Sequence, residues 1–191
     1  MLEKFVKYLN DYIQFDKAEL TYLKDFAETR IYKKNELIFE VGAISHEIYF
    51  VIDGCVRLFY LADGQDRTAF FFTEGQFICA GESYTFRVPA RENYQAIEDS
   101  QIVLFKRSVI DTLLEKSPKF ELLARIATEN ELIICQRMIE SFVTKSAEER
   151  YIELLETNGE LFHRVPQQYI ASFLGVSPET LSRIKKRVLG K

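Results

Sequence analysis

The residues with the most informative chemistry stand on one face of a short predicted helix near the end of the chain. Glu179, Ser182 and Arg183 follow Pro178 at helical spacing, and apolar residues recur on the other side. A carboxylate accepts hydrogen bonds from a cytosine amino group, and a guanidinium donates two parallel bonds to guanine O6 and N7. The same charges also fit an ordinary i,i+4 ion pair on an exposed helix. We favour the first interpretation, in which this face reads base edges in DNA.

A second short helix and a tight turn are predicted immediately before this face. Residues 167–174 have an apolar side, Gly175 tolerates the positive φ that such a turn needs, and Ser177 can cap the next helix. Pro178 then occupies the first helical position, where its missing N–H costs nothing. Two helices joined in this way form a helix-turn-helix. The residues expected to contact double-stranded DNA are Gln167, Ser177, Glu179, Thr180, Ser182, Arg183, Lys186 and Arg187.

Positive charge is concentrated at the end of an otherwise acidic chain. The 191 residues carry a formal net charge of −4, yet the last eleven hold five basic groups and no acidic one. A local basic region of this kind attracts phosphate groups. Contact with nucleic acid is therefore expected at the C-terminal end and not over the whole surface.

The elements that position this unit can be predicted along the chain. Residues 1–25 indicate two short helices, the second capped by Asp16, and a β-rich stretch punctuated by glycines follows. The dipeptides Asp53-Gly54 and Asp63-Gly64 are each typical of a hairpin turn. Regular short strands favour a sandwich or barrel. They are expected at residues 48–53, 55–62, 67–73, 93–98 and 101–105.

A long helix is predicted over residues 118–143, followed by a capped helix over 146–157. The long helix is apolar on more than one side, so one face can cover the β-rich region while another is left for a partner. A seam with alternating steps of four and three residues predicts a homodimer, in which Asn130 would set the register. A long core helix in a monomer is the alternative. The expected dimer interface consists of Leu123, Ala127, Asn130, Ile134 and Arg137.

Enzymes, metal proteins and membrane proteins are disfavoured by the contents of the chain. Its three cysteines are widely spaced and it has two histidines, too few to converge on a metal site. No Walker A, G-x-S-x-G or H-E-x-x-H pattern occurs, so no catalytic residue, metal or cofactor is expected. The charged start is unlike a signal peptide, and no apolar run approaches the roughly 20 residues that cross a bilayer. We expect a cytoplasmic protein without membrane contact.

The order of β-rich region, long helix and helix-turn-helix resembles the family of the cyclic-AMP receptor protein and the fumarate-nitrate regulator (CRP/FNR). The resemblance is found in IYFVIDGCVRLFYL (48–61), GQFICAGES (75–83) and QQYIASFLGVSPETLSR (167–183). It implies an α+β fold with three parts. The first is a cyclic-nucleotide-binding-like effector domain (1–117), which is a β-barrel of jelly-roll type. The second is a dimerisation helix (118–145), and the third is a winged-helix-like helix-turn-helix domain (146–191). The wing is expected to be truncated, because the chain stops soon after the recognition helix.

The resemblance also implies a function, with one departure in the effector region. Family members are homodimeric transcription regulators that bind palindromic DNA and contact RNA polymerase. Members that bind cyclic nucleotides follow a Gly-Glu pair with an Arg-Ser or Arg-Thr that holds the phosphate. Gly81, Glu82 and Ser83 resemble the first half, but Ala90-Arg91 stands near the second half. The candidate effector residues are therefore Gly81, Glu82, Ser83 and Arg91, and classical binding of cyclic AMP is not expected.

Two other functions remain open from the sequence. One is a regulator gated by an unidentified small molecule, held by aromatic residues of the β-rich region that are otherwise ordinary core. These aromatic residues are Phe59, Phe70, Phe71, Phe72, Phe77 and Phe86. The other is a dimeric scaffold that recruits protein partners and uses its helix-turn-helix only as framework.

Overall fold

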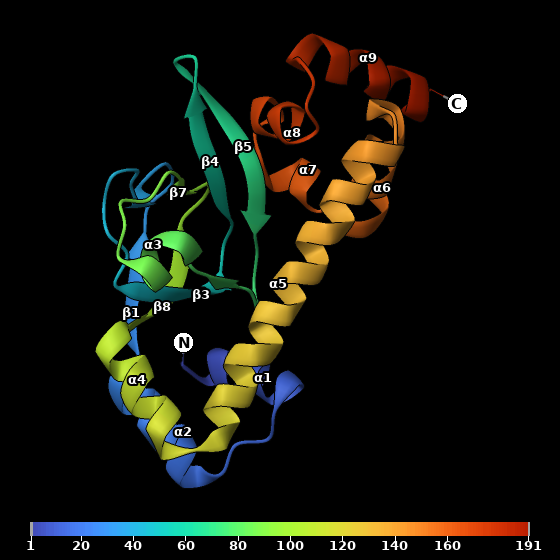
Figure 1. Ribbon diagram of the computed structural model, residues 1–191. Coiled ribbons are helices and arrows are strands. Elements are labelled where there is room, and N and C mark those ends of the chain that lie inside the picture. Colours follow the sequence, from blue (N-terminus) through green and yellow to red (C-terminus); the bar gives the residue numbers. More distant parts are fainter. Residues whose placement is uncertain (1, 191) are drawn as a thin grey trace.

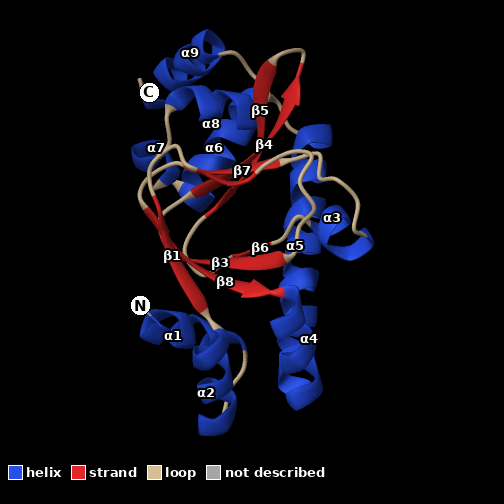
Figure 2. Cartoon of the chain, turned by 90° about the vertical axis from the view of Figure 1, so that its left-hand side faces the viewer, coloured by secondary structure: helices blue, strands red, loops and turns tan. Residues whose placement is uncertain are grey.

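Two antiparallel sheets pack face to face at the centre of the molecule (Figure 1, Figure 2). The computed structural model describes residues 2–190. Its strands are β1 (Glu28–Tyr32), β2 (Leu37–Phe39), β3 (Glu47–Asp53), β4 (Val56–Ala62), β5 (Gln65–Phe72), β6 (Phe77–Ile78), β7 (Asn93–Ala96) and β8 (Ser100–Lys106). One sheet has the order β1-β8-β3-β6 and the other β2-β7-β4-β5. We call residues 28–106 the β-sandwich; this arrangement and the helices that follow confirm the expected α+β fold.

Strand β3 is buried on both faces, which explains its uninterrupted apolar sequence. Side chains alternate across a strand, so Tyr49 and Val51 point into the core between the two sheets. Phe50 and Ile52 point the other way, into a second core that lies outside the first sheet. Strand β8 repeats this alternation. The two strands therefore join the interior of the β-sandwich to the helices that cover it.

Helices from both ends of the β-sandwich form that covering layer. They are α1 (Leu2–Tyr12), α2 (Lys17–Phe26), α4 (Arg107–Lys116) and the first turns of α5 (Pro118–Thr144). Phe5, Leu9, Leu113, Phe120 and Leu123 pack there against β3 and β8. The two N-terminal helices, the cap at Asp16 and the long helix confirm the sequence predictions. Helix α4 and the short α3 (Gly81–Phe86) were not predicted.

One of the two predicted hairpin turns forms and the other does not. Asp63 and Gly64 have φ values of 53° and 73° and join the paired strands β4 and β5. Asp53-Gly54 instead carries the chain from one sheet to the other, because β3 pairs with β6 and β8 while β4 pairs with β5 and β7. Gly54 has a φ of 108°, and a Cβ there would lie 2.7 Å from the Ser100 Cα. The hairpin prediction at Asp53-Gly54 is wrong, since the dipeptide makes a tight crossing over β8.

The described residues 146–190 form four helices joined by short turns. These helices are α6 (Ala147–Asn158), α7 (Leu161–Arg164), α8 (Gln167–Phe173) and α9 (Pro178–Leu189). Ser146 and Glu149 form the predicted capping box at the start of α6. Beyond α9 the structure describes Gly190 alone, so a wing strand is not among the described residues.

These helices pack on the outer side of the β-sandwich, beside β5 (Figure 1). Phe71 of β5 lies 5.3 Å from Phe173 of α8, measured between ring centroids. The backbone N–H of Thr68, on the edge strand β5, donates to the Ser172 Oγ at 2.9 Å. Phe71 also belongs to the same apolar cluster as the interior of the C-terminal helices. The helix-turn-helix is therefore docked on its own β-sandwich.

Two arginines strengthen this docking. The Arg57 guanidinium is almost fully buried, 3.6 Å from the ring centroid of Tyr169 on α8, and donates to Asp66 at 2.6 Å. Arg164 of α7 donates to Glu74 at 2.7 Å and to Glu98 at 2.6 Å, both in the β-sandwich. Burial disfavours the ionised form of Glu74, but hydrogen bonds from Arg164 and from backbone N–H groups outweigh it. The pKa of Glu74 therefore lies below its usual range.

We predict that Arg164→Leu lowers the free energy of unfolding at pH 7 by about 1–3 kcal/mol, because two partly buried carboxylates lose their counter-ion. The pKa of Glu74 is depressed in the folded state, so its contribution is present above the unfolded value of about 4.3 and is lost as the pH falls through the folded pKa. Urea denaturation between pH 3 and 7 measures both effects, and the variant should show a weaker acid dependence.

The matched control is Lys33→Met, which removes an exposed pair with Asp99 at 2.7 Å. This variant should retain the stability of the parent chain. Equal stability of the Arg164→Leu chain and the parent would show that the arginine does not hold the helix-turn-helix in place.

Candidate nucleic-acid interface and effector pocket

The turn between α8 and α9 has the geometry expected of a helix-turn-helix. Gly175 has a φ of 70°, in the left-handed region, and its N–H donates to the Ser172 carbonyl at 3.0 Å. The Ser177 Oγ accepts from the Thr180 N–H at 3.2 Å, and Pro178 is the first residue of α9. The cap and the turn thus start α9 at the position predicted from sequence.

Packing of the two helices decides which side of α9 is available. Leu181 and Ile184 are buried in one cluster with Ile170 of α8, with Leu174 just after α8 and with Tyr151 of α6. The opposite side of α9 faces solvent. Its exposed polar side chains are Glu179, Ser182, Arg183, Lys186 and Arg187. Gln167 and Ser177 are also exposed, and Thr180 is half-buried.

Contacts on this face differ from the simple ion pair considered above. The Arg183 Nη2 donates to the Thr180 Oγ1 at 3.0 Å. Within residues 2–190, no ion pair of 4.0 Å or less joins Glu179 to Arg183. A hydrogen bond with Ser177, a backbone N–H and the more distant charge of Arg183 lower the pKa of Glu179. Glu179 and Arg183 thus lie on one exposed face without a direct contact between their charged groups.

Lys186 and Arg187 extend the basic side of α9 toward the C-terminus. The Arg187 Nη2 lies 3.0 Å from the Glu148 Oε2 of α6, and both groups are accessible to solvent. An exposed pair of this kind is weak, so the guanidinium can exchange its carboxylate for a phosphate at small cost. The face therefore carries a carboxylate and a guanidinium at its start and basic side chains farther along.

The four candidate effector residues lie close together but do not form an open anion site. Gly81, Glu82 and Ser83 begin the short α3. Ser83 is fully buried, and its Oγ accepts from the Ser45 N–H at 2.9 Å. The Arg91 Nε lies 3.6 Å from the Glu82 Oε2, and both side chains are mostly exposed. The arginine faces a carboxylate of its own chain, which a bound phosphate would have to displace.

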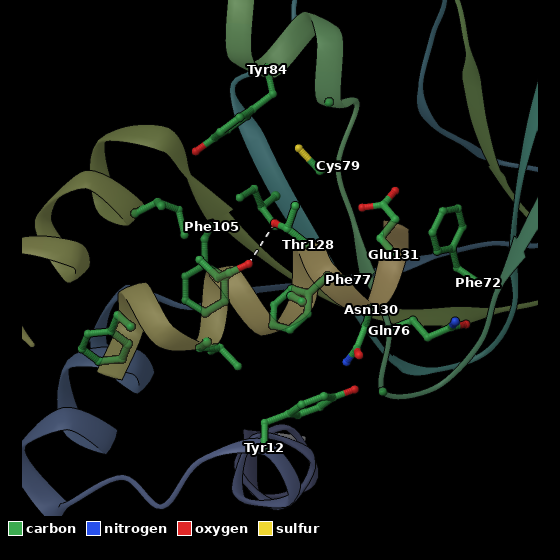
Figure 3. A pocket seen from close by; sticks show the side chains of 18 of the residues that line it. Tyr12, Phe72, Gln76, Phe77, Cys79, Tyr84, Phe105, Thr128, Asn130 and Glu131 are labelled. Atoms are coloured by element: carbon green, nitrogen blue, oxygen red, sulfur yellow. Dashed lines mark hydrogen bonds between the residues drawn. The ribbon is translucent and has the colours of Figure 1, made fainter. Parts of the chain in front are cut away.

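A cavity of about 740 Å³ lies between α5, the β-sandwich and α1 (Figure 3). Its walls are mainly apolar and include Phe72, Phe77 and Phe105. Glu131 of α5 also lines it, and burial raises the pKa of this carboxyl group. Burial likewise raises the pKa of the Cys79 thiol to about 12, so that this cysteine is an unreactive wall residue.

The sequence predicted only some of the aromatic residues that line this cavity. Phe70, Phe72 and Phe77 line it, whereas Phe71 packs on α8 and Phe86 is 70 % exposed. The polar wall residues Tyr12, Thr128 and Glu131 were missed. Their signal was weak, because a single acid or hydroxyl on a long helix is ordinarily a solvated residue.

The five residues predicted for the dimer interface also face this cavity. Leu123 is 8 % exposed and packs in the core outside the first sheet. Ala127, Asn130, Ile134 and Arg137 line the same cavity wall. In a single chain this side of α5 is thus turned toward its own β-sandwich. Contact of these residues with a second chain stays a prediction.

Searches for metal and membrane features within residues 2–190 gave negative results. No group of three or more His, Cys, Asp or Glu side chains there could hold a metal ion. None of the helices in that range is both long and apolar enough to span a bilayer.

Comparisons with known proteins agree with this architecture. Residues 29–117 match the cyclic nucleotide-binding domain family. A search of curated proteins gave no significant match. The structure of FixK2 from Bradyrhizobium japonicum is similar, with 24 % identity, coverage of 86 % of each chain and a TM-score of 0.72.

Two further structures cover more of the chain at lower identity. The c-di-GMP-responsive global regulator CLP from Xanthomonas campestris has 17 % identity, coverage of 92 % of each chain and a TM-score of 0.75. A protein from Eubacterium rectale, assigned as a transcriptional regulator of the crp/fnr family, has 17 % identity and a TM-score of 0.72. That match covers 96 % of this chain and 89 % of the other. Residues 29–117 thus match the cyclic nucleotide-binding domain family, and the chain shares its fold with structures of CRP/FNR-type transcription regulators, as its sequence predicted.

Proposed function

We propose that this protein is a sequence-specific DNA-binding transcription regulator whose recognition helix is α9. The observation that carries the proposal is the exposed polar face of α9, set on a helix-turn-helix whose other side is fully packed. Docking of such a helix into the major groove brings its first turns to the base edges. The similarity to regulators of the CRP/FNR type supports the same function.

The exposed residues divide into two roles by their chemistry. Arg183 donates to guanine, and Glu179 accepts from cytosine, with Ser182 beside them. The remaining residues hold the phosphate backbone and set the position of the helix. These are Gln167, Ser177, Thr180, Lys186 and Arg187.

The regulator acts as a homodimer on palindromic sites, with half-sites about 34–36 Å apart. In this proposal residues 1–117 are the effector domain, 118–145 the dimerisation helix and 146–191 the DNA-binding domain. Contact with RNA polymerase is a further part of the proposal, which the family resemblance supports.

We predict that Arg183→Ala weakens binding to the preferred site by roughly 1–3 kcal/mol and relaxes the preference at one base position. The reason is that the bidentate pair to guanine is lost. Selection from a pool of random duplexes with purified protein, followed by titration of the enriched site, measures both effects.

Arg187→Ala is the matched control, because it removes an equal charge from the same helix at a phosphate-binding position. It should weaken binding to all sequences alike and leave the selected sequence unchanged. If Arg183→Ala kept the affinity and preference of the parent chain, α9 would not read bases, and the scaffold function would gain support.

Gating by a small molecule is a second candidate function, favoured by the cavity of about 740 Å³ beside α5. Its volume and apolar walls suit a drug-sized ligand. In this proposal the ligand is not cyclic AMP bound through its phosphate, because Ala90-Arg91 stands near the position where family members that bind cyclic nucleotides have Arg-Ser or Arg-Thr. Mass spectrometry of the purified protein after denaturation tests whether an apolar molecule copurifies.

We predict that 1 mM cyclic AMP leaves the melting temperature of the protein unchanged. A ligand that binds the folded state raises its stability according to the ratio of concentration to Kd, so the absence of a shift indicates a Kd above about 1 mM. Differential scanning fluorimetry of the parent chain and of Arg91→Ala provides the measurement. A rise of several degrees in the parent that Arg91→Ala abolishes would make Arg91 a phosphate ligand.

A further inference from the structure

One hydroxyl group on the exposed face of α9 contacts the arginine that is proposed to read a base. The Arg183 Nη2 donates to the Thr180 Oγ1 at 3.0 Å. The Ser177 Oγ also donates to this oxygen, at 3.3 Å, and itself accepts from the Thr180 N–H at 3.2 Å. Ser177, Thr180 and Arg183 therefore form a connected row that runs from the helix cap to the guanidinium.

The position of Thr180 in its helix explains why its oxygen is available to Arg183. A threonine in a helix interior can donate its hydroxyl proton to the carbonyl four residues earlier. Five threonines of this chain do so at 2.8 or 2.9 Å: Thr21, Thr112, Thr128, Thr144 and Thr157. Thr180 stands in the first turn of α9, and the residue four places earlier, Val176, precedes the cap. The Thr180 hydroxyl group is thus left for side chains.

A hydroxyl partner holds the Arg183 guanidinium without neutralising its charge. Thr180 uses one of the five N–H donors of the guanidinium. The four donors that remain are enough for two parallel bonds to a guanine edge. At Arg187 the partner is instead the Glu148 carboxylate, at 3.0 Å, which a phosphate has to replace. Thr180 therefore holds its arginine without competing with DNA for the charge.

Thr180 is itself held in place by the start of α9. Its side chain is half-buried, and its β-branched shape restricts the rotation about χ1. Because its Oγ1 accepts from both Ser177 and Arg183, its own proton is free to bind a phosphate. The same side chain can thus contact the phosphate backbone and order the guanidinium.

We propose that Thr180 is a positioning residue for Arg183 and thereby determines sequence specificity. Its oxygen orders the guanidinium before DNA is bound, so that less side-chain entropy is lost when Arg183 meets its base. On a site with the wrong base that contact is not made, and the ordering brings no gain. The inference rests on the proposed function, in which Arg183 reads a base.

Binding of the Thr180→Val chain to two duplexes tests this role. One duplex is the site that the parent chain selects, and the other differs from it only at the base pair that Arg183→Ala ceases to specify. Valine keeps the β-branched shape and the backbone N–H that Ser177 caps, so only the hydroxyl group is lost. Fluorescence anisotropy titration gives the ratio of the two dissociation constants, which is expected to fall about 3- to 10-fold.

Three controls separate the hydroxyl group from other effects. Thr180→Ser keeps the oxygen and should keep the ratio of the parent chain. Thr112→Val makes the same change in α4, at the opposite end of the molecule from α9 (Figure 1), and should also keep it. In the Arg183→Ala chain, Thr180→Val should leave the ratio unchanged, because the two residues act as a unit. The salt dependence of binding should be the same for Thr180→Val and the parent, since no charge is removed.

The outcomes distinguish positioning from a phosphate contact and from the proposed function. An equal loss of affinity for both duplexes would show that Thr180 only binds a phosphate, and would overturn the positioning role. A ratio that falls as much in the Arg183→Ala chain would overturn it too, because the effect would not pass through Arg183. If Arg183→Ala kept the sequence preference of the parent, base reading by Arg183 would itself be wrong, and the role of Thr180 with it.

Discussion

The docking of the helix-turn-helix on the β-sandwich is the constraint on which the orientation of α9 depends. It is a polar interface as much as an apolar one. The Arg57 guanidinium lies between the Phe59 and Tyr169 rings, at 4.2 and 3.6 Å from their centroids. Arg164 donates to carboxylates at two separate turns of the β-sandwich. Charged groups that are partly buried are stable only with their partners in place, so this interface favours one arrangement and disfavours partial opening.

Helix α5 connects three surfaces that have different chemistry. Its first turns belong to the core outside the first sheet, its middle lines the cavity, and its end contacts the helix-turn-helix. At that end Phe142 lies 4.5 Å below the Arg150 guanidinium, and Arg150 donates to the Lys145 and Leu174 carbonyls. One side chain thus ties the end of α5 to the turn before α9. A displacement of α5 cannot leave the recognition helix unchanged.

The sequence predicted local features such as turns and helix caps. It did not predict which strands pair or which side of a helix is covered. Gly175, Ser177 and Pro178 define their turn by backbone conformation and capping alone, so the helix-turn-helix could be predicted residue by residue. The hairpin prediction at Asp53-Gly54 was wrong because a local turn preference does not determine which strands pair. The side of α5 that contacts a second chain also could not be predicted from local preferences. Two apolar sides have the same periodicity, and only the packed chain shows which one the β-sandwich covers.

Helix α5 forms a wall of the proposed ligand cavity and is also the proposed dimerisation helix. Glu131 of α5 lines the cavity. Burial already raises the pKa of its carboxyl group in the single chain. A ligand that donates a hydrogen bond to Glu131 would favour the ionised carboxylate and be held against α5. Binding at this wall would couple to the position of the recognition helix, because a rigid helix of 27 residues transmits a rotation at its middle to its end.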